Sequence, residues 1–257
     1  MLVRAQLVVM HDNVTYGAAF ADVYDEWYGD IDDLDDVVGL LAESSPRRVL
    51  ELGVGTGRIA IPLAARLRAS GNQTSVTGLD ESPEMLARLA ENDTHGLIHA
   101  VRGDMADDQP SGPFDLVFIS YNTLFNLIGH DRQRRCVTNS SARLATRGLL
   151  IIDACVIDSA SPQPTHGTTS EQRGPWHLRT ETSFDSASGR VTGTITSQHE
   201  DGRVTLRPFT ITYSTPENID DMCTQAGLAL VARYGSWQRT TFDDDSPRHV
   251  SVYRNLR

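Results

Sequence analysis

The chain has 257 residues, of which 39% are hydrophobic and 22% charged, as in an ordinary globular protein. With 34 acidic and 23 basic residues its formal net charge is −11, so its surface repels phosphate backbones and anionic membranes, which disfavours a nucleic-acid or membrane partner. All 23 basic residues are arginine, which excludes chemistry that needs a lysine, such as a Schiff base or a Walker phosphate loop.

Residues 16–28 carry four aromatic side chains at helical spacing: Phe20, Tyr24, Trp27 and Tyr28. This pattern predicts a helix that either packs on the rest of the domain or forms a lid over a binding site. The acidic run 30–36 predicts the solvated start of a second helix, where the helix dipole favours carboxylates. Steering of a cationic substrate is the alternative role for this run.

Residues 47–156 alternate short apolar runs with helical stretches. The predicted strands are 48–52, 75–79, 97–101, 114–120 and 149–154. The predicted helices are 57–69, a helix that starts after Ser82, and 131–145. Ser82-Pro83-Glu84 is a favourable helix start, with a capping serine, a first-turn proline and an acid. Strands that alternate with helices predict a parallel sheet covered by helices on both faces.

The pattern changes after residue 158. Residues 161–167 have the composition of a loop, and three period-2 stretches follow, separated by turn residues: 176–184, 190–199 and 203–213. This arrangement predicts an antiparallel meander. The α/β pattern then returns, with a helix at 216–227 and strands at 228–234 and 249–254, so the meander is an insertion in an α/β domain.

The most informative segment is 49–57, an apolar strand with an acid followed by alternate glycines and a helix: Glu51, Gly53, Gly55 and Gly57. Glycines permit positive φ angles and a close approach of a ligand to the backbone. A dinucleotide fingerprint has the spacing G-x-G-x-x-G, whereas here the third glycine comes one residue early and Arg58 fills the later position. The acid before the glycines favours a ligand with an ammonium group over a diphosphate.

Polar residues also follow the next strands. Asp80 can accept hydrogen bonds from ribose hydroxyls, and Asp104 and Met105 can contact an adenine, with Met85 on its other face. Each has a structural alternative, since such aspartates often cap turns and such methionines often lie in the core. Ser120 and the residues up to 125 should border the site, because open α/β sheets bind ligands at the carboxyl ends of their strands.

These elements, in this order, resemble the class I S-adenosylmethionine-dependent methyltransferases over 47–156 and 216–256. The resemblance implies a doubly wound, seven-stranded, mostly parallel Rossmann-like sheet whose last strand, at about 249–256, is antiparallel. It implies S-adenosylmethionine as cofactor and S-adenosylhomocysteine as product, with Glu51 near the methionine moiety, Asp80 on the ribose, and Asp104 and Met105 around the adenine. The full expected cofactor-binding set is Tyr24, Glu51, Gly53, Gly55, Gly57, Asp80, Met85, Asp104, Met105 and Ser120.

The aromatic N-terminal segment and the run Asn122-Thr123-Leu124-Phe125 resemble antibiotic amino-sugar N-methyltransferases and, more narrowly, those of lincosamide biosynthesis. The resemblance implies methyl transfer to an amine of a small, sugar-containing antibiotic or its precursor. A neutral amine needs no strong base, so we expect Tyr16, Tyr24 and Phe125 to orient the substrate.

Other functions remain open at this point. A small-molecule O-methyltransferase would need a base, for which a histidine is the candidate. A non-catalytic module could keep only the cofactor site. A nicotinamide-dependent oxidoreductase is disfavoured by the glycine spacing. No spacing of histidine and acidic residues predicts a metal site.

The sequence divides into four predicted parts: an N-terminal helical lid (1–45), a cofactor-binding core (46–160), an antiparallel insertion (161–214) and a C-terminal completion of the core (215–257). We expect the insertion to pair with a second subunit in a homo-oligomer, because exposed sheet edges tend to be covered. The three cysteines are widely spaced and predict no disulfide framework. The N-terminal apolar run is too short for a signal peptide or a membrane span, so we expect a cytoplasmic enzyme acting on a small-molecule amine.

Overall fold

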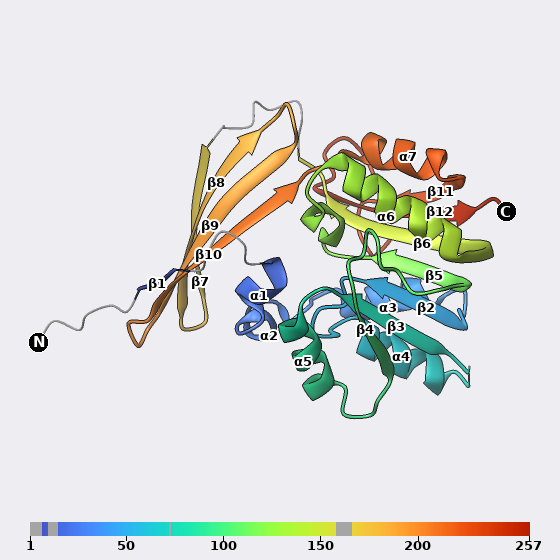
Figure 1. Ribbon diagram of the computed structural model, residues 1–257, viewed down its shortest axis with the longest axis horizontal. Coiled ribbons are helices and arrows are strands. Elements are labelled where there is room, and N and C mark those ends of the chain that lie inside the picture. Colours follow the sequence, from blue (N-terminus) through green and yellow to red (C-terminus); the bar gives the residue numbers. More distant parts are fainter. Residues whose placement is uncertain (1–6, 10–14, 72, 158–165) are drawn as a thin grey trace, which may run out of the picture.

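The computed structural model describes residues 7–9, 15–71, 73–157 and 166–257. They form two separate β-sheets, with the first two helices between them (Figure 1). Within these ranges, no helix is both long and apolar enough to cross a membrane.

The larger sheet confirms the predicted doubly wound fold. Its strand order is β11-β12-β6-β5-β2-β3-β4. The strands are β2 (Arg48–Leu52), β3 (Ser75–Asp80), β4 (Ile98–Arg102), β5 (Phe114–Ile119), β6 (Leu144–Cys155), β11 (Leu228–Tyr234) and β12 (Arg248–Asn255). Five neighbouring strands, β6, β5, β2, β3 and β4, are parallel to one another. β12 runs antiparallel to both β6 and β11.

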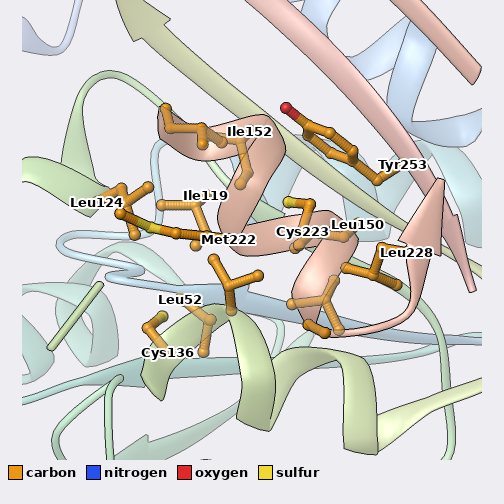
Figure 2. Packing of buried hydrophobic residues seen from close by; sticks show 14 of the residues in the cluster. Leu52, Ile119, Leu124, Cys136, Leu150, Ile152, Met222, Cys223, Leu228 and Tyr253 are labelled. Atoms are coloured by element: carbon orange, nitrogen blue, oxygen red, sulfur yellow. The ribbon is translucent and has the colours of Figure 1, made fainter. Parts of the chain in front are cut away.

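Helices cover both faces of this sheet: α3 (Leu34–Ala42), α4 (Ala60–Ala69), α5 (Pro83–Asn92), α6 (His130–Arg143) and α7 (Pro216–Gln225). Successive side chains of a strand point to opposite faces, so Val117 belongs to the apolar cluster under α6 and α7, while Leu116 and Phe118 belong to the cluster under α3 and α4. Figure 2 shows the first cluster, with Met222 and Cys223 of α7 packed over Leu150. The predicted cap of α5 is present, since Ser82 Oγ accepts a hydrogen bond from Met85 N at 3.2 Å.

The smaller sheet contains the predicted meander and two strands that the sequence did not predict. Its order is β1-β10-β9-β8-β7, and its strands are β1 (Leu7–Val9), β7 (His166–Arg173), β8 (Trp176–Asp185), β9 (Arg190–His199) and β10 (Val204–Thr212). The strands from β7 to β10 are antiparallel, and β1 pairs with β10 in parallel. Of the predicted loop 161–167, residues 161–165 lie outside the described ranges and the last two residues begin β7. β7 lacks an apolar alternation, which explains why it reads as a loop.

The predicted N-terminal helix is broken into α1 (Tyr16–Phe20) and α2 (Tyr24–Tyr28). In a continuous helix the carbonyl of Ala19 would accept from Val23 N. Here Arg207 of β10 donates to that carbonyl, and Val23 N bonds to Phe20 O at 3.0 Å instead. A side chain of the second sheet thus takes the place of one helical hydrogen bond and fixes the bend.

Candidate functional site

A pocket lies where β2, β3 and β4 end, beneath α1 and α2. We call it the strand-end pocket. Its lining is Tyr16, Gly17, Tyr24, Gly53, Gly55, Leu79, Asp80, Glu81, Met85, Gly103, Asp104, Met105, Thr123, Asn126, Leu127 and Arg132. The topology therefore brings together most of the side chains that the sequence singled out.

The three glycines after β2 have positive φ angles of 74°, 55° and 86° but serve different purposes. A Cβ on Gly57 would come within 2.4 Å of Leu89 Cδ1, so this glycine permits the packing of α4 on α5. A Cβ on Gly53 would meet Thr123 Cγ2 at 2.2 Å. At Gly55 the nearest atom, Tyr24 Cε1, would be 3.8 Å away, which leaves room for a ligand against the backbone.

Two carboxylates stand at the ends of β2 and β3, Glu51 buried and Asp80 partly buried. Asp80 accepts hydrogen bonds from Gly55 N and Ser82 N, both at 2.9 Å, and burial raises its pKa. Glu51 is 2% exposed, and its Oε2 has no hydrogen-bond partner among the described residues. Burial raises the pKa of Glu51 well above its usual value, while the charge of Arg58 and the hydroxyl of Ser120 lower it. An unpartnered buried acceptor of this kind suits a cationic donor on a ligand.

Asp104, at the end of β4, forms an ion pair with Arg132 of α6. Its Oδ1 also accepts from Ala106 N at 2.8 Å. The neighbouring Glu81 has a pKa raised by burial and then by Asp104 and Asp80, and lowered by Arg132. Arg132 therefore offsets the negative charges of Asp104 and Glu81, which line the same pocket.

Tyr16 and Tyr24 form the boundary between this pocket and two neighbouring clefts. Burial raises the pKa of both phenols above the ordinary value of 10, so both are neutral at pH 7. The ring of Tyr16 stacks on Phe20 with centroids 4.5 Å apart. These phenols can donate hydrogen bonds but cannot serve as bases near neutrality.

The first neighbouring cleft, which we call the apolar cleft, lies between these tyrosines and the second sheet. It measures about 260 Å³, and Ile195, Phe209 and Ile211 of the second sheet line one side. The second, the arginine cleft, measures about 660 Å³. Its lining is Tyr16, Tyr24, Trp27, Tyr28, Asp30, Ile31, Asp32, Asp33, Arg58, Tyr121, Asn122, Arg173 and Arg248.

Four predicted site residues do not line the pocket or the clefts. Glu51, Gly57 and Ser120 are buried and line none of these three spaces. Phe125 is fully buried in the core, where its ring packs against Tyr213 at 5.4 Å. The turn η1 (Thr123–Asn126) turns Phe125 inward.

The sequence analysis missed several residues that line the strand-end pocket: Gly17, Glu81, Asn126, Leu127 and Arg132. Thr123 lies within the stretch 120–125 that was expected to border the site, and Asn126 follows it directly. The position after a strand end was therefore the signal that could have identified Asn126. Arg132 lies on a helix with no distinguishing motif, and nothing local points to it.

Comparisons with known proteins agree with this geometry. A family model described as a methyltransferase domain matches residues 49–148, and no curated protein matches. The solved CcbJ methyltransferase from Streptomyces caelestis is 31% identical, with a TM-score of 0.85 over 96% of this chain and 100% of that one.

Two more distant structures share the fold. CalS10 from Micromonospora echinaspora, an amino pentose methyltransferase solved with bound S-adenosylmethionine, is 20% identical, with a TM-score of 0.66 over 96% of this chain and 100% of that one. The sugar N-methyltransferase KedS8 from a Streptoalloteichus species is 17% identical, with a TM-score of 0.69 over 98% of each chain.

Proposed function

The chain belongs to the S-adenosylmethionine-dependent methyltransferases, and we propose that it methylates the amine nitrogen of a small, sugar-containing antibiotic or precursor. The observation that carries the proposal is the boundary formed by Tyr16 and Tyr24, two neutral phenols between the strand-end pocket and both clefts. In the described part of the chain, no histidine lines these three spaces, which favours an amine over a hydroxyl acceptor that needs a base.

The residues of the strand-end pocket fit the cofactor. When bound, S-adenosylmethionine supplies a methyl group on a sulfonium, which an uncharged amine can take by direct displacement. Glu51, with its unpartnered Oε2, would hold the ammonium of the methionine moiety. Asp80 would accept from the ribose hydroxyls with the lone pairs that its two backbone contacts leave free.

The adenine would lie among Met85, Met105 and Leu127, which give the pocket its apolar part. Arg132 and Ala106 N already occupy the carboxylate of Asp104, so only its remaining lone pairs would be available to the adenine amine. We propose that Arg132, through its ion pair with Asp104, holds that carboxylate in place in the pocket.

Tyr16 and Tyr24 would orient the amine and exclude water. Alignment of the reacting groups can contribute on the order of 7–11 kcal/mol, and phenol rings attract a cationic centre. Phe125, which the sequence placed with them, is enclosed in the core. Thr123 and Asn126 line both the strand-end pocket and the apolar cleft and take its place in this proposal.

The acceptor class draws on similarity as well as geometry. CalS10 and KedS8 are described as methyltransferases of an amino pentose and a sugar amine, which supports an amino-sugar acceptor. The aromatic N-terminal segment and the Asn122–Phe125 run support a lincosamide-type acceptor within that class. A small-molecule O-methyltransferase and a non-catalytic cofactor-binding module are the alternatives that the experiments must separate.

We also propose that the second sheet pairs with another copy of the chain. β7 is an edge strand of that sheet, and unpaired strand edges tend to be covered. Sedimentation at several concentrations tests this, and a monomer at all of them would contradict it.

The cofactor assignment is tested by calorimetric titration with S-adenosylmethionine, S-adenosylhomocysteine and NAD. We expect the first two to bind and NAD not to bind. The Asp80→Asn variant keeps an oxygen for Gly55 N but loses the charge, so affinity for both should fall about 10- to 100-fold. Preference for NAD, or an unchanged affinity in the variant, would contradict the assignment.

The acceptor assignment is tested by incubation with amino sugars and with the same sugars bearing a hydroxyl in place of the amine. We expect S-adenosylhomocysteine formation and a product one methyl heavier only with the amines. Tyr16→Phe and Tyr24→Phe should lower kcat/KM more than they lower cofactor affinity, although both side chains also line the cofactor pocket. Wild-type kcat/KM in both variants would remove the orienting role, and transfer only to hydroxyls would establish the O-methyltransferase alternative.

A further inference from the structure

The arginine cleft contains an unusual stack around Tyr121. The ring of Tyr121 lies between two guanidinium groups, with Arg58 Cζ 4.6 Å and Arg248 Cζ 5.1 Å from its centroid. Both arginines line the cleft. Because both arginines contact Tyr121 and line the same cleft, their hydrogen-bond partners can be compared directly.

Arg248 is fully paired. Its Nε and Nη2, the two parallel donors of one guanidinium edge, bind Asp153 Oδ1 at 3.0 Å and Oδ2 at 2.7 Å. Its Nη1 donates to Asp33 Oδ2 at 3.2 Å. Asp153 is 1% exposed, so the protein itself supplies a buried carboxylate to this edge, in the bidentate geometry that guanidinium groups favour.

Arg58 presents the same edge with no hydrogen-bond acceptor on it among the described residues. Its Nη1 donates to Tyr28 O at 2.8 Å, and its Cζ lies 5.2 Å from the centroid of Tyr24. Within the described ranges, its Nε and Nη2 donate to no acceptor and it forms no ion pair. The carbonyl of Tyr28 and the two rings therefore hold a guanidinium in place while leaving its bidentate edge available.

The third arginine of the cleft strengthens the contrast. Arg173 pairs with Glu171 at 2.9 Å and donates to Trp27 O at 2.9 Å. Leaving a half-buried cation unpaired is costly unless a ligand or water satisfies its donors. Among the described residues, Arg58 is thus the arginine of this cleft whose Nε and Nη2 are open to a ligand, while its charge also acts on the buried Glu51.

We propose that the methyl acceptor carries an anionic group with two oxygens, a carboxylate or a phosphate, which binds the Nε and Nη2 edge of Arg58. The inference rests on the proposed function, because it takes the cleft beyond Tyr16 and Tyr24 as the acceptor site. The acceptor amine would then lie at these tyrosines, and its anionic group would lie at Arg58. An apolar part of the acceptor would extend against Ile195 and Phe209 in the apolar cleft.

Ligand-observed NMR on the complex with S-adenosylhomocysteine tests this with three probes: benzoate, phenyl phosphate and the neutral benzamide. We expect at least one anion to bind about 10- to 100-fold more tightly than benzamide, as charge-assisted bidentate bonds allow. The tighter of the two anions identifies the group. If neither anion binds more tightly than benzamide, the proposal is wrong.

Variants locate the effect. Arg58→Gln should abolish the preference for the anion, and Arg58→Lys should keep part of it, because an ammonium has the charge without the planar fork. Arg173→Gln is the matched control in the same cleft and should keep the preference. Loss of the preference in Arg173→Gln but not in Arg58→Gln would overturn the assignment.

The carboxylate of the cofactor is the competing source of an anion. Calorimetric titration of Arg58→Gln with S-adenosylhomocysteine should show a loss of less than about tenfold, because the variant removes a charge that lowers the pKa of Glu51; binding also shows that the variant is folded. A tenfold or larger loss would assign Arg58 to the cofactor and overturn the proposal. Because the probe measurements need no methyl transfer, absence of transfer to amines would contradict only the proposed function, whereas absence of the anion preference would contradict only the role of Arg58.

Discussion

The two sheets are stabilised in opposite ways. The central strands of the seven-stranded sheet are buried on both faces by apolar layers, with Leu50, Leu116 and Val117 all fully inaccessible. In the second sheet, β7 has no buried residue among its eight. The most buried long side chain of that sheet is Arg207, at 1% exposure.

The second sheet is joined to α1 and α2 by a small apolar cluster, to which Trp176 and Leu178 belong, and by polar contacts of a buried arginine. Arg207 binds both oxygens of Asp22, at 2.6 and 2.7 Å, and lies 5.3 Å from the ring centroid of Trp27. Trp176 packs edge-on against Trp27 with centroids 5.6 Å apart. Because α1 and α2 also cover the strand-end pocket, these contacts connect the second sheet to the site.

The largest effect should come from leaving Arg207 unpaired. Asp22→Ala removes its carboxylate partner and leaves a buried guanidinium with neutral partners among the described residues: the carbonyl of Ala19, the hydroxyl of Ser197 and two aromatic rings. We expect a loss of about 3–5 kcal/mol in the free energy of unfolding, measured by urea denaturation.

The reverse variant is the control for that prediction. Arg207→Met leaves Asp22, whose side chain is 58% exposed and so can be solvated by water. It should therefore cost less, about 1–3 kcal/mol. Equal losses in the two variants would show that burial of the charge does not decide the strength of this junction.

The sequence predicted the first region much better than the second. In the seven-stranded sheet, local patterns were sufficient: apolar runs buried on both faces, the Ser82 cap and the glycine turn. The break between α1 and α2 depends on Arg207, which is 188 residues from Ala19, and no local pattern reports it. β7 was missed because its side chains are mostly exposed and polar.

The residues of the candidate site also differ in how well the sequence predicts them. Residues at strand ends, such as Asp80 and Asp104, could be placed because parallel strands bring their carboxyl ends together. Phe125 was expected to face the substrate because it is aromatic and follows a strand, but the turn at 123–126 directs its ring into the core. The sequence could not predict the roles of Arg132 and Arg58. Arg132 matters because it pairs with Asp104 in the folded chain, and Arg58 matters because its Nε and Nη2 have no acceptor among the described residues.

A second prediction concerns the stability of the seven-stranded sheet at acid pH, because its strand β12 contains a buried histidine. His249 is fully buried beside Ser251, at 2.8 Å between Nδ1 and Oγ, and burial, reinforced by Arg233, lowers its pKa to about 4. Between an unfolded pKa near 6.5 and this value, the unfolded chain binds a proton that the folded chain does not. Stability is therefore lost as pH falls through this window.

At about 1.4 kcal/mol per pKa unit, the loss due to His249 should be about 2 kcal/mol at pH 5. We expect the stability difference between the wild type and His249→Gln to narrow by that amount from pH 7.5 to pH 5, in urea denaturation at each pH. The exposed His95→Gln serves as the control for loss of a histidine. A constant difference would show that His249 binds its proton at the same pH in the folded and the unfolded chain.

The smallest effect should come from the polar contact beside the tryptophan pair. Trp176 Nε1 donates to Glu26 Oε1 at 2.7 Å, and Trp176→Phe removes that bond while keeping an aromatic ring against Trp27. Glu26 is exposed, so water can replace the lost donor and the cost should be about 1 kcal/mol. Glu26→Gln keeps an acceptor oxygen and should cost less, and both values come from thermal or urea denaturation. If Trp176→Phe instead lowers the free energy of unfolding as much as Asp22→Ala does, the junction depends on the tryptophan as much as on the buried charge. The buried charge would then no longer distinguish the second sheet from the first.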